Sequence, residues 1–177
     1  ISIVGTLITD NLVDNFGVRL ETAVILFSLA LSATFISWYV SEKTLSIHTI
    51  FTTKRELFYW TAILFTFALG TAAGDLAAER WNLGYAVSGL IFATLIGIIT
   101  LSYYFLKANA VAAFWFAYIL TRPLGASFGD YLSQPANNGG LAMGTINTSI
   151  AFLVIIFGLV VYLTVNRREI GMEKVRD

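Results

Sequence analysis

Long apolar stretches alternate with short polar segments along nearly the whole chain. A helix of about 20 residues crosses a hydrocarbon core about 30 Å thick, so an apolar stretch of that length predicts a transmembrane helix. Four stretches fit with at most one terminal charge, and a fifth fits although it contains Arg122 and Pro123. The predicted spans are Leu20–Val40, Leu57–Gly74, Leu83–Leu106, Ala110–Gly129 and Leu141–Val165. Ile1–Thr9 is too short to span, so we expect the chain to enter partway through a helix.

This pattern predicts an all-α fold: a polytopic transmembrane helical bundle with about five full spans and a partial N-terminal helix. The composition agrees, because 57% of the residues are hydrophobic and only 12% are charged, whereas soluble domains have about 25% charged residues. We expect one membrane domain over residues 1–177, with the lipid bilayer as its main partner. The net charge is zero and the basic residues are scattered, which excludes nucleic acid as a partner.

Basic residues outside the spans lie mostly on one side of the membrane, and the positive-inside rule makes that side cytoplasmic. Only Arg19 and Arg80 fall on the other side. The basic residues on the predicted cytoplasmic side are Lys43, Lys54, Arg55, Lys107, Arg167, Arg168, Lys174 and Arg176. The segment 167–177 is therefore predicted to be a cytoplasmic tail.

An internal repeat is the most specific feature of the sequence. YWTAILFTFALGTAAGD at 59–75 aligns with FWFAYILTRPLGASFGD at 114–130, at an offset of 55 residues. The aligned pairs include Trp60 with Trp115, Thr66 with Thr121, Gly70 with Gly125, Gly74 with Gly129, and Asp75 with Asp130. GTLITD at 5–10 matches the end of this motif, with Thr9 in place of the second glycine. Each unit predicts an αα-hairpin, at about 1–41 with its first helix incomplete, 57–106 and 110–166.

Small residues four apart recur in these helices and predict close helix crossings, since such residues let helices approach each other in lipid. This interpretation applies to Gly70 with Gly74 and to Gly125 with Gly129. The return helices of the hairpins show similar pairs, and there Gly140 and Gly144 align with Gly84 and Ser88.

The tandem two-helix unit, with its early tryptophan and its G-x-x-x-G-D ending, resembles bacterial uncharacterised membrane-anchored proteins built from a repeat of unknown function. The resemblance covers nearly the whole chain through Arg168. It implies four tandem copies, the missing part lying upstream of Ile1, and a multi-pass protein of the bacterial cytoplasmic (inner) membrane. It implies no chemistry, because the repeat has no established activity.

The repeated aspartates are candidate ion ligands. Asp10, Asp75 and Asp130 each end a helix on the predicted outer side, where Glu21 also lies. Clustered carboxylates attract cations, and hard oxygen donors suit Mg²⁺, Ca²⁺ or Mn²⁺, although the metal stays unknown. An alternative is that each aspartate only accepts backbone hydrogen bonds in the loop or caps the next helix. The repeated threonines, Thr66 and Thr121, are further candidates.

Arg122 is the other candidate. It precedes Asp130 by eight residues, or about 12 Å of helix, so it is predicted to lie inside the membrane, where an unpaired cation is costly. Phe67 occupies the same position in the preceding copy. We therefore expect Arg122 to join the outer carboxylates in a polar network, in a functional or a purely structural role. Pro123 beside it favours a kink.

The sequence predicts no enzyme and no cofactor, because it contains no nucleophile–histidine–acid set, no histidine cluster and no phosphate-binding loop. The single histidine, His48, lies in a polar loop, and there is no cysteine. The favoured function is a secondary transporter or channel-like protein for a small cation or polar solute. A homo-oligomer is a possible assembly. The alternative is a membrane sensor, binding or scaffold protein.

Overall fold

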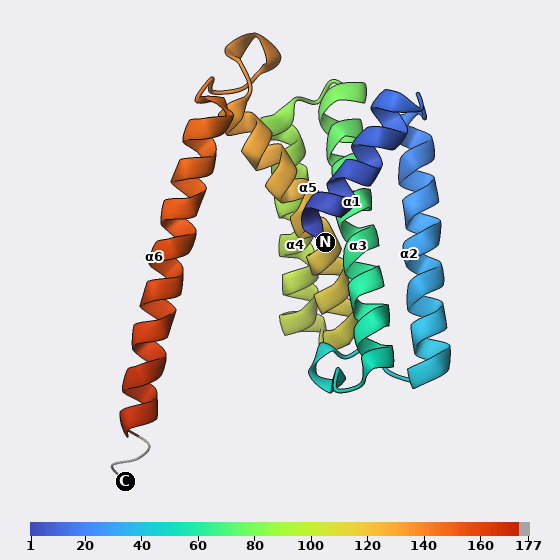
Figure 1. Ribbon diagram of the computed structural model, residues 1–177, viewed down its shortest axis with the longest axis vertical. Helices are drawn as coiled ribbons and strands as arrows, with labels where there is room; N and C mark the ends of the chain where they lie inside the picture. The colour runs from blue at the N-terminus through green and yellow to red at the C-terminus, as the bar shows by residue number, and fades with distance from the viewer. Residues whose placement is uncertain (174–177) are drawn as a thin grey trace. The chain divides into compact units, whose positions relative to one another are not determined.

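The structure is a computed structural model that describes the backbone of residues 1–173 and the side chains of residues 1–165. Over these residues the chain forms α-helices, short 3₁₀ and π-helical turns, and no strand. The helices are α1 Ser2–Asp10, α2 Leu20–Glu42, α3 Thr53–Asp75, α4 Tyr85–Leu106, α5 Ala110–Ser133 and α6 Gly144–Glu173 (Figure 1). The chain divides into two compact units, Ile1–Asp130 and Tyr131–Asp177, with the boundary near the end of α5. The predicted all-α fold is confirmed.

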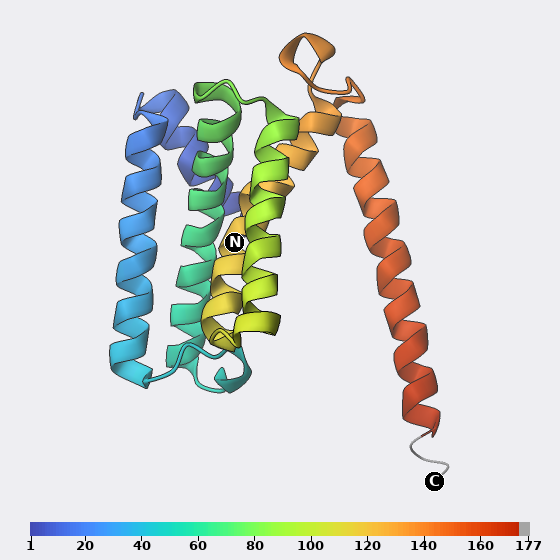
Figure 2. The ribbon, with the colours of Figure 1, turned by 180° about the vertical axis from the view of Figure 1, so that it is seen from behind.

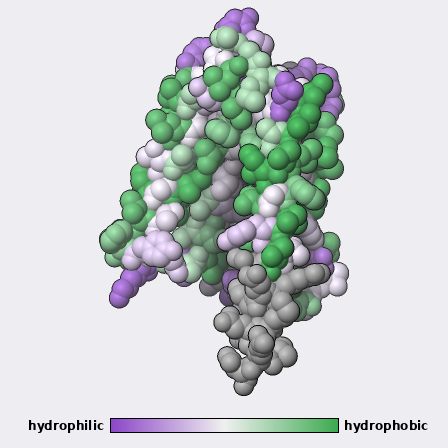
Figure 3. Space-filling model, turned by 90° about the vertical axis from the view of Figure 1, so that its left-hand side faces the viewer, coloured by the Kyte–Doolittle hydropathy of each residue, from purple (hydrophilic) through white to green (hydrophobic). Residues whose placement is uncertain are grey.

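Five segments are long and apolar enough to cross a membrane, and they match the five predicted spans. They are Leu20–Glu42, Thr53–Arg80, Tyr85–Leu106, Ala110–Ser133 and Gly144–Val165. On the face drawn in Figure 3, hydrophobic side chains cover the middle of the helices, and hydrophilic ones gather toward the ends. This distribution fits a bilayer, whose core admits apolar side chains and whose surfaces admit polar ones.

In the first unit, α3 is the central helix. It packs against both α1 and α2, and α4 and α5 lie on the side of α3 away from α2 (Figures 1 and 2). One cluster of buried side chains joins α2 and α3 through Ala23, Phe27, Ala68 and Ala72. A second joins α2, α3 and α5 and is mainly aromatic, with Trp38 and Trp115 at its centre.

Two of the three repeat copies leave the membrane in the same way. Both α1 and α3 end at their aspartate and continue into a π-helical turn, at Asn11–Asn15 and Leu76–Arg80. Gly17 and Asn82, which are 65 residues apart, then adopt φ values of +66° and +53°. The third copy departs from this pattern, because α5 runs on to Ser133. It also continues through Pro123 as one helix.

The second unit begins with a longer loop that closes on itself through backbone hydrogen bonds, such as Leu141 N–H to Tyr131 O at 2.7 Å. Gly140 lies in this loop, where an added Cβ would collide with the Gln134 carbonyl. Gly144 starts α6 with φ +75°, the value that Gly84 has before α4. The structure thus places Gly144, and not Gly140, at the position of Gly84.

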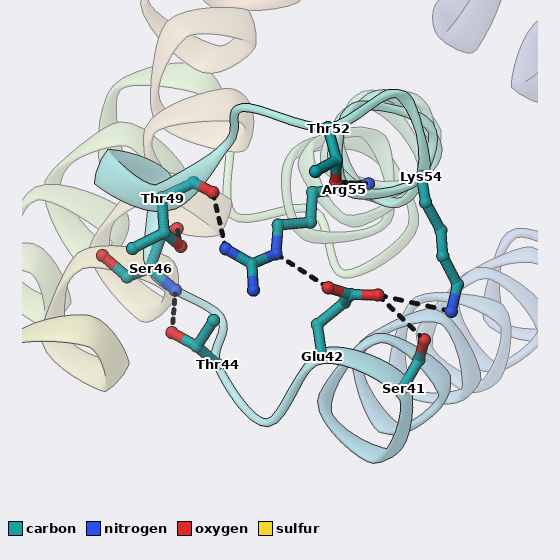
Figure 4. A network of polar contacts seen from close by, with 8 residues as sticks. All are labelled: Ser41, Glu42, Thr44, Ser46, Thr49, Thr52, Lys54 and Arg55. Atoms are coloured by element: carbon teal, nitrogen blue, oxygen red, sulfur yellow. Dashed lines mark hydrogen bonds and ion pairs between the residues drawn. The ribbon is translucent and has the colours of Figure 1, made fainter.

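The loop between α2 and α3 is held by a polar network (Figure 4). Glu42, at the end of α2, binds Arg55 at 2.8 Å and Lys54 at 3.3 Å, both from the first turn of α3. Thr52 caps α3 by accepting a hydrogen bond from the Arg55 N–H, which explains why α3 begins before Leu57. His48 is exposed in the same loop, on a short 3₁₀ turn.

Candidate functional site

The glycines of the repeat lie where helices of the first unit touch. A Cβ added to Gly5 of α1 would be 2.6 Å from the Phe67 Cβ of α3. A Cβ added to Gly70 of α3 would meet the Arg122 Cβ of α5 in the same way. These two glycines are 65 residues apart and occupy the same position of the motif, so α1 meets α3 as α3 meets α5.

The second glycine of the motif also lies in this contact. A Cβ added to Gly74 would be 3.6 Å from the Ala126 Cβ and 3.7 Å from the Pro123 Cα. Thr9 replaces this glycine in the first copy and is 1% exposed. Its hydroxyl donates a hydrogen bond to the Ala68 carbonyl at 2.9 Å, which satisfies the polar group that the substitution buries.

The glycine pair of the third copy, Gly125 and Gly129, has different surroundings. Within the unit Ile1–Asp130, no atom lies within 4 Å of a Cβ built on Gly125 or Gly129. The sequence predicted a close crossing at this pair as well, but in this unit the contact is made at the equivalent positions of α1 and α3 and not at Gly125 or Gly129.

The three repeated aspartates gather at one end of the first unit, where α1 and α3 end and α5 carries Asp130; we call this the carboxylate end. Asp75 is half-buried and lies within electrostatic reach of Glu79, Asp130, Asp10 and Asp14. Asp10 lies outside the five spans, and there burial, together with the Asp14 charge, raises the pKa of its carboxyl.

Within residues 1–165, Asp10, Asp75 and Asp130 form no ion pair with a lysine or arginine. Among residues 1–165, the acidic partners of the ion pairs are Glu21 and Glu42. Glu21 binds Arg19 at 3.3 Å and Arg80 at 3.2 Å, so this candidate is engaged at the surface and stands apart from Asp75. In the described part of the chain, no group of three or more His, Cys, Asp or Glu side chains is arranged to hold a metal ion.

Arg122 does not meet the carboxylates, contrary to the expected network. Its guanidinium lies 3.8 Å from the centre of the Phe67 ring and 4.5 Å from that of the Tyr118 ring. It also donates a hydrogen bond to the Tyr118 hydroxyl, while its buried Nε has no hydrogen-bond partner among the described residues. Ring faces attract cations, so aromatic side chains supply the stabilisation that we expected from aspartates.

The repeated threonines satisfy their hydroxyls within their own helices. Thr66 is fully buried and donates to the Ile63 carbonyl at 2.8 Å. Thr121 is exposed and donates to the Tyr118 carbonyl at 2.6 Å. Each hydroxyl proton is therefore engaged, and only the acceptor lone pairs of each oxygen remain for a ligand.

The repeated tryptophans have different surroundings. Trp115 is 4% exposed, donates from Nε1 to the Leu45 carbonyl at 2.9 Å, and packs edge-on against Trp38 and Phe35. Trp60 is 43% exposed and donates to Glu56 at 3.2 Å. The equivalence is therefore one of sequence position and not of burial.

Two buried serines were missed by the sequence interpretation. The hydroxyls of Ser88 and Ser127 have no hydrogen-bond partner among the described residues, although both residues are at most 2% exposed. Gly89 brings α4 onto α5 beside Ser127, because an added Cβ would be 3.6 Å from the Ser127 Cβ. Ser127 precedes Asp130 by three residues, so a small polar residue one turn from a repeated aspartate was the available signal.

Buried small-residue helix contacts and five helices long and apolar enough to span a bilayer define a multi-pass α-helical membrane protein. The chain matches the family described as Repeat of Unknown Function (DUF347) at residues 1–44, 58–109 and 113–169. It belongs to this family, with three copies of the repeat, as its sequence predicted. No curated protein and no solved structure matches the chain.

Proposed function

We propose that this protein moves a small cation or polar solute across the membrane, as a secondary transporter or channel-like protein, and that the carboxylate end collects the cation. The observation that carries the proposal is Asp75. It is half-buried, it has four other carboxylates within electrostatic reach, and it forms no ion pair within residues 1–165. Negative charge that is partly buried and uncompensated favours the binding of a cation or a proton.

Two buried serine hydroxyls on α4 and α5 support transport over simple charge display. Ser127 lies about one helical turn deeper than Asp130, and its hydroxyl and that of Ser88 lack partners within the described part of the chain. Buried polar groups are nearly always hydrogen-bonded, so exceptions call for an explanation. We assign these hydroxyls to a transient partner, which is water or the transported solute.

The absence of a chelating group among the described residues also bears on the substrate. Ca²⁺ takes six to eight oxygen ligands, and Mg²⁺ requires octahedral geometry. A spread of carboxylates without a three-ligand group suits a proton or a hydrated, weakly held cation better than a tightly coordinated divalent ion.

Reconstitution in liposomes tests the proposal, with flux measured for protons and for a panel of monovalent and divalent cations. We expect flux from the unmodified protein and a loss of about tenfold in Asp75→Asn, which removes the central charge. Glu21→Gln is the matched control, because Glu21 lies at the same end but is held by Arg19 and Arg80. Glu21→Gln is expected to keep its flux. Equal flux in both variants, or none in the unmodified protein, contradicts the proposal.

A second candidate is a membrane binding, sensor or scaffold protein, and the packing at the opposite end of the first unit favours it. There Trp38, Phe58 and Trp115 form a dense aromatic cluster. A mainly apolar groove of about 760 Å³ runs beside this cluster, between α2 and α5. Single cysteines placed along α3 and α5 discriminate the candidates, because water-soluble reagents label a continuous stripe in a transport pathway and only the helix ends in a closed bundle.

A further inference from the structure

The contact between α1 and α3 and the contact between α3 and α5 are one contact, repeated along the chain. Gly5 of α1 lies on Phe67 and Ala68 of α3. Gly70 of α3 lies on Arg122 and Pro123 of α5, which are the aligned positions of the next copy. α3 therefore presents its glycine face to the following first helix, α5, and receives the glycine face of the preceding one, α1, on a different side.

The two sides of α3 make a corner. Successive residues of an α-helix are rotated by about 100°. On that scale the α3 positions that meet α1, at Leu64, Phe67 and Ala68, are centred about a quarter turn from those that meet α5, at Gly70 and Gly74. Helices joined through quarter-turn corners return to the start after four members, so α1, α3 and α5 occupy three corners of a square.

The two faces that would border the fourth corner are both open in this unit. On α5, nothing lies within 4 Å of a Cβ built on Gly125 or Gly129. On α1, Ser2 and Ile3 occupy the positions of Phe67 and Ala68; Ser2 is exposed, and Ile3 is 73% exposed. Within residues 1–130, one face is therefore a glycine face that no helix covers, and the other is an uncovered face of the kind that receives such glycines on α3 and α5.

We propose that these two faces bind a single transmembrane helix that runs parallel to α5 and has the chemistry of α3. Such a helix presents a G-x-x-x-G pair to the Ser2–Ile3 face of α1 and a bulky residue followed by small ones to Gly125 and Gly129. In lipid, this close packing of small residues is what drives helix association. The bound helix also borders the side of the bundle where the buried Nε of Arg122 has no partner among the described residues.

A whole second copy of the chain does not fit the fourth corner. If α1 of a second copy docked on Gly125, the same quarter-turn step would place α3 of that copy where α1 of the first copy already lies. The position takes one helix, and the contact repeated inside the chain specifies its direction and register.

Disulfide trapping tests the proposal, because the chain has no cysteine of its own. The probe is a synthetic peptide with the sequence of α3, Thr53–Asp75, mixed with the full chain in lipid bilayers. Gly74 and Ala126 define the pair to copy, since their Cβ atoms would be 3.6 Å apart, within the range that a disulfide spans. In the proposed contact with α5, Gly129 of the chain takes the place of Gly74 and Thr71 of the peptide takes the place of Ala126. The pair is therefore Gly129→Cys in the chain with Thr71→Cys in the peptide. On the other face it becomes Thr6→Cys in the chain with Gly74→Cys in the peptide.

We expect both pairs to cross-link at least tenfold faster than Gly97→Cys, a control on α4 where an added Cβ meets nothing within 4 Å. The double variant Gly74→Cys/Ala126→Cys of the chain should close internally, which verifies the fold and the chemistry. Rates at Gly129 or Thr6 equal to the control rate overturn the proposal. So does trapping of Gly129→Cys by a cysteine placed in α6, because the face would then belong to the last helix of the chain.

Discussion

At the scale of single residues, the helix contacts depend on the missing side chain of a few glycines. Gly70 is buried, and a Cβ added to it would collide with the Arg122 Cβ and lie 3.3 Å from the Pro123 Cδ of α5. Rigid atoms of this kind cannot move aside as the end of a flexible side chain can. The space that Gly70 leaves is therefore part of the contact, whereas Gly97 on α4 faces open surroundings within 4 Å.

Gly70→Ala should lower the free energy of unfolding by about 1–3 kcal/mol, because the new methyl group overpacks the contact with α5. Gly97→Ala is the matched control. Alanine is favoured over glycine in a helix by about 1 kcal/mol, so this variant should be unchanged or more stable. Denaturant titration in detergent micelles measures both. A Gly70→Ala protein as stable as Gly97→Ala would show that α3 and α5 do not touch at this position.

Arg122 shows how an intramembrane cation can be held without a carboxylate. The Phe67 and Tyr118 rings lie on its guanidinium, and Phe67 is the residue that replaces it in the preceding copy. Arg122 thus contacts the residue that aligns with it in the preceding copy of the repeat.

Arg122→Met should therefore lose about 1–2 kcal/mol of unfolding free energy through the lost cation–π contacts. Combining it with Asp130→Asn should add the two single effects to within about 0.5 kcal/mol, because the groups are not paired. A double-mutant cycle measures this coupling. Recovery of stability in the double variant would instead show that Arg122 and Asp130 form an ion pair.

At the scale of helices, equivalent positions in the repeat meet different neighbours. Trp115 is covered by α2 and by the loop that supplies the Leu45 carbonyl, while Trp60 faces outward. The difference arises because α2 and the α2–α3 loop pack on Trp115, whereas Trp60 donates only to Glu56 of its own helix within the described residues.

Trp115→Phe should lower the free energy of unfolding by about 1–3 kcal/mol, since it leaves the Leu45 carbonyl unsatisfied and opens a space in the aromatic cluster. Trp60→Phe should change it by less than about 0.5 kcal/mol, as is usual for exposed positions. The two variants make the same chemical change one repeat apart, and thermal unfolding followed by tryptophan fluorescence compares them. Equal effects would mean that α2 and the α2–α3 loop do not cover Trp115.

The sequence predicted the helices better than their contacts, for a physical reason. Span positions follow from apolar runs, which any bilayer selects, so all five spans were found from hydropathy. α3 starts before the predicted Leu57 because Thr52 caps the helix ahead of the apolar run. The partner of Arg122 was missed because Coulomb attraction suggested aspartates, whereas Phe67 reaches it only through the packing of α3 on α5. The gathering of Asp10, Asp75 and Asp130 was predictable from the repeat, but the engagement of Glu21 by Arg80 was not.

At the scale of the whole molecule, the repeat fixes the direction of the first helices. The starts of α3 and α5 lie at one end of the first unit and their aspartates lie at the other, so each hairpin crosses the membrane and returns. Most lysines and arginines of residues 1–130 lie at the end opposite the carboxylates, as Lys54 and Arg55 do, although Arg19 and Arg80 lie at the carboxylate end. Sidedness and function are thus linked, because a cation-collecting cluster faces outward only if the basic loop faces the cytoplasm.

Labelling of single cysteines tests this sidedness in intact cells. Lys54→Cys and Asn137→Cys both replace exposed side chains, one in the loop end that carries the basic residues and one in the loop that follows α5. By the positive-inside rule, a membrane-impermeant maleimide should label Asn137→Cys from outside and should reach Lys54→Cys only after the membrane is opened. His48→Cys is the control for Lys54→Cys, because it is exposed in the same loop and takes no part in the ion pairs around Glu42. Labelling of both loops from outside would contradict the five-span arrangement, and labelling of Lys54→Cys alone would invert it and place the carboxylate end in the cytoplasm.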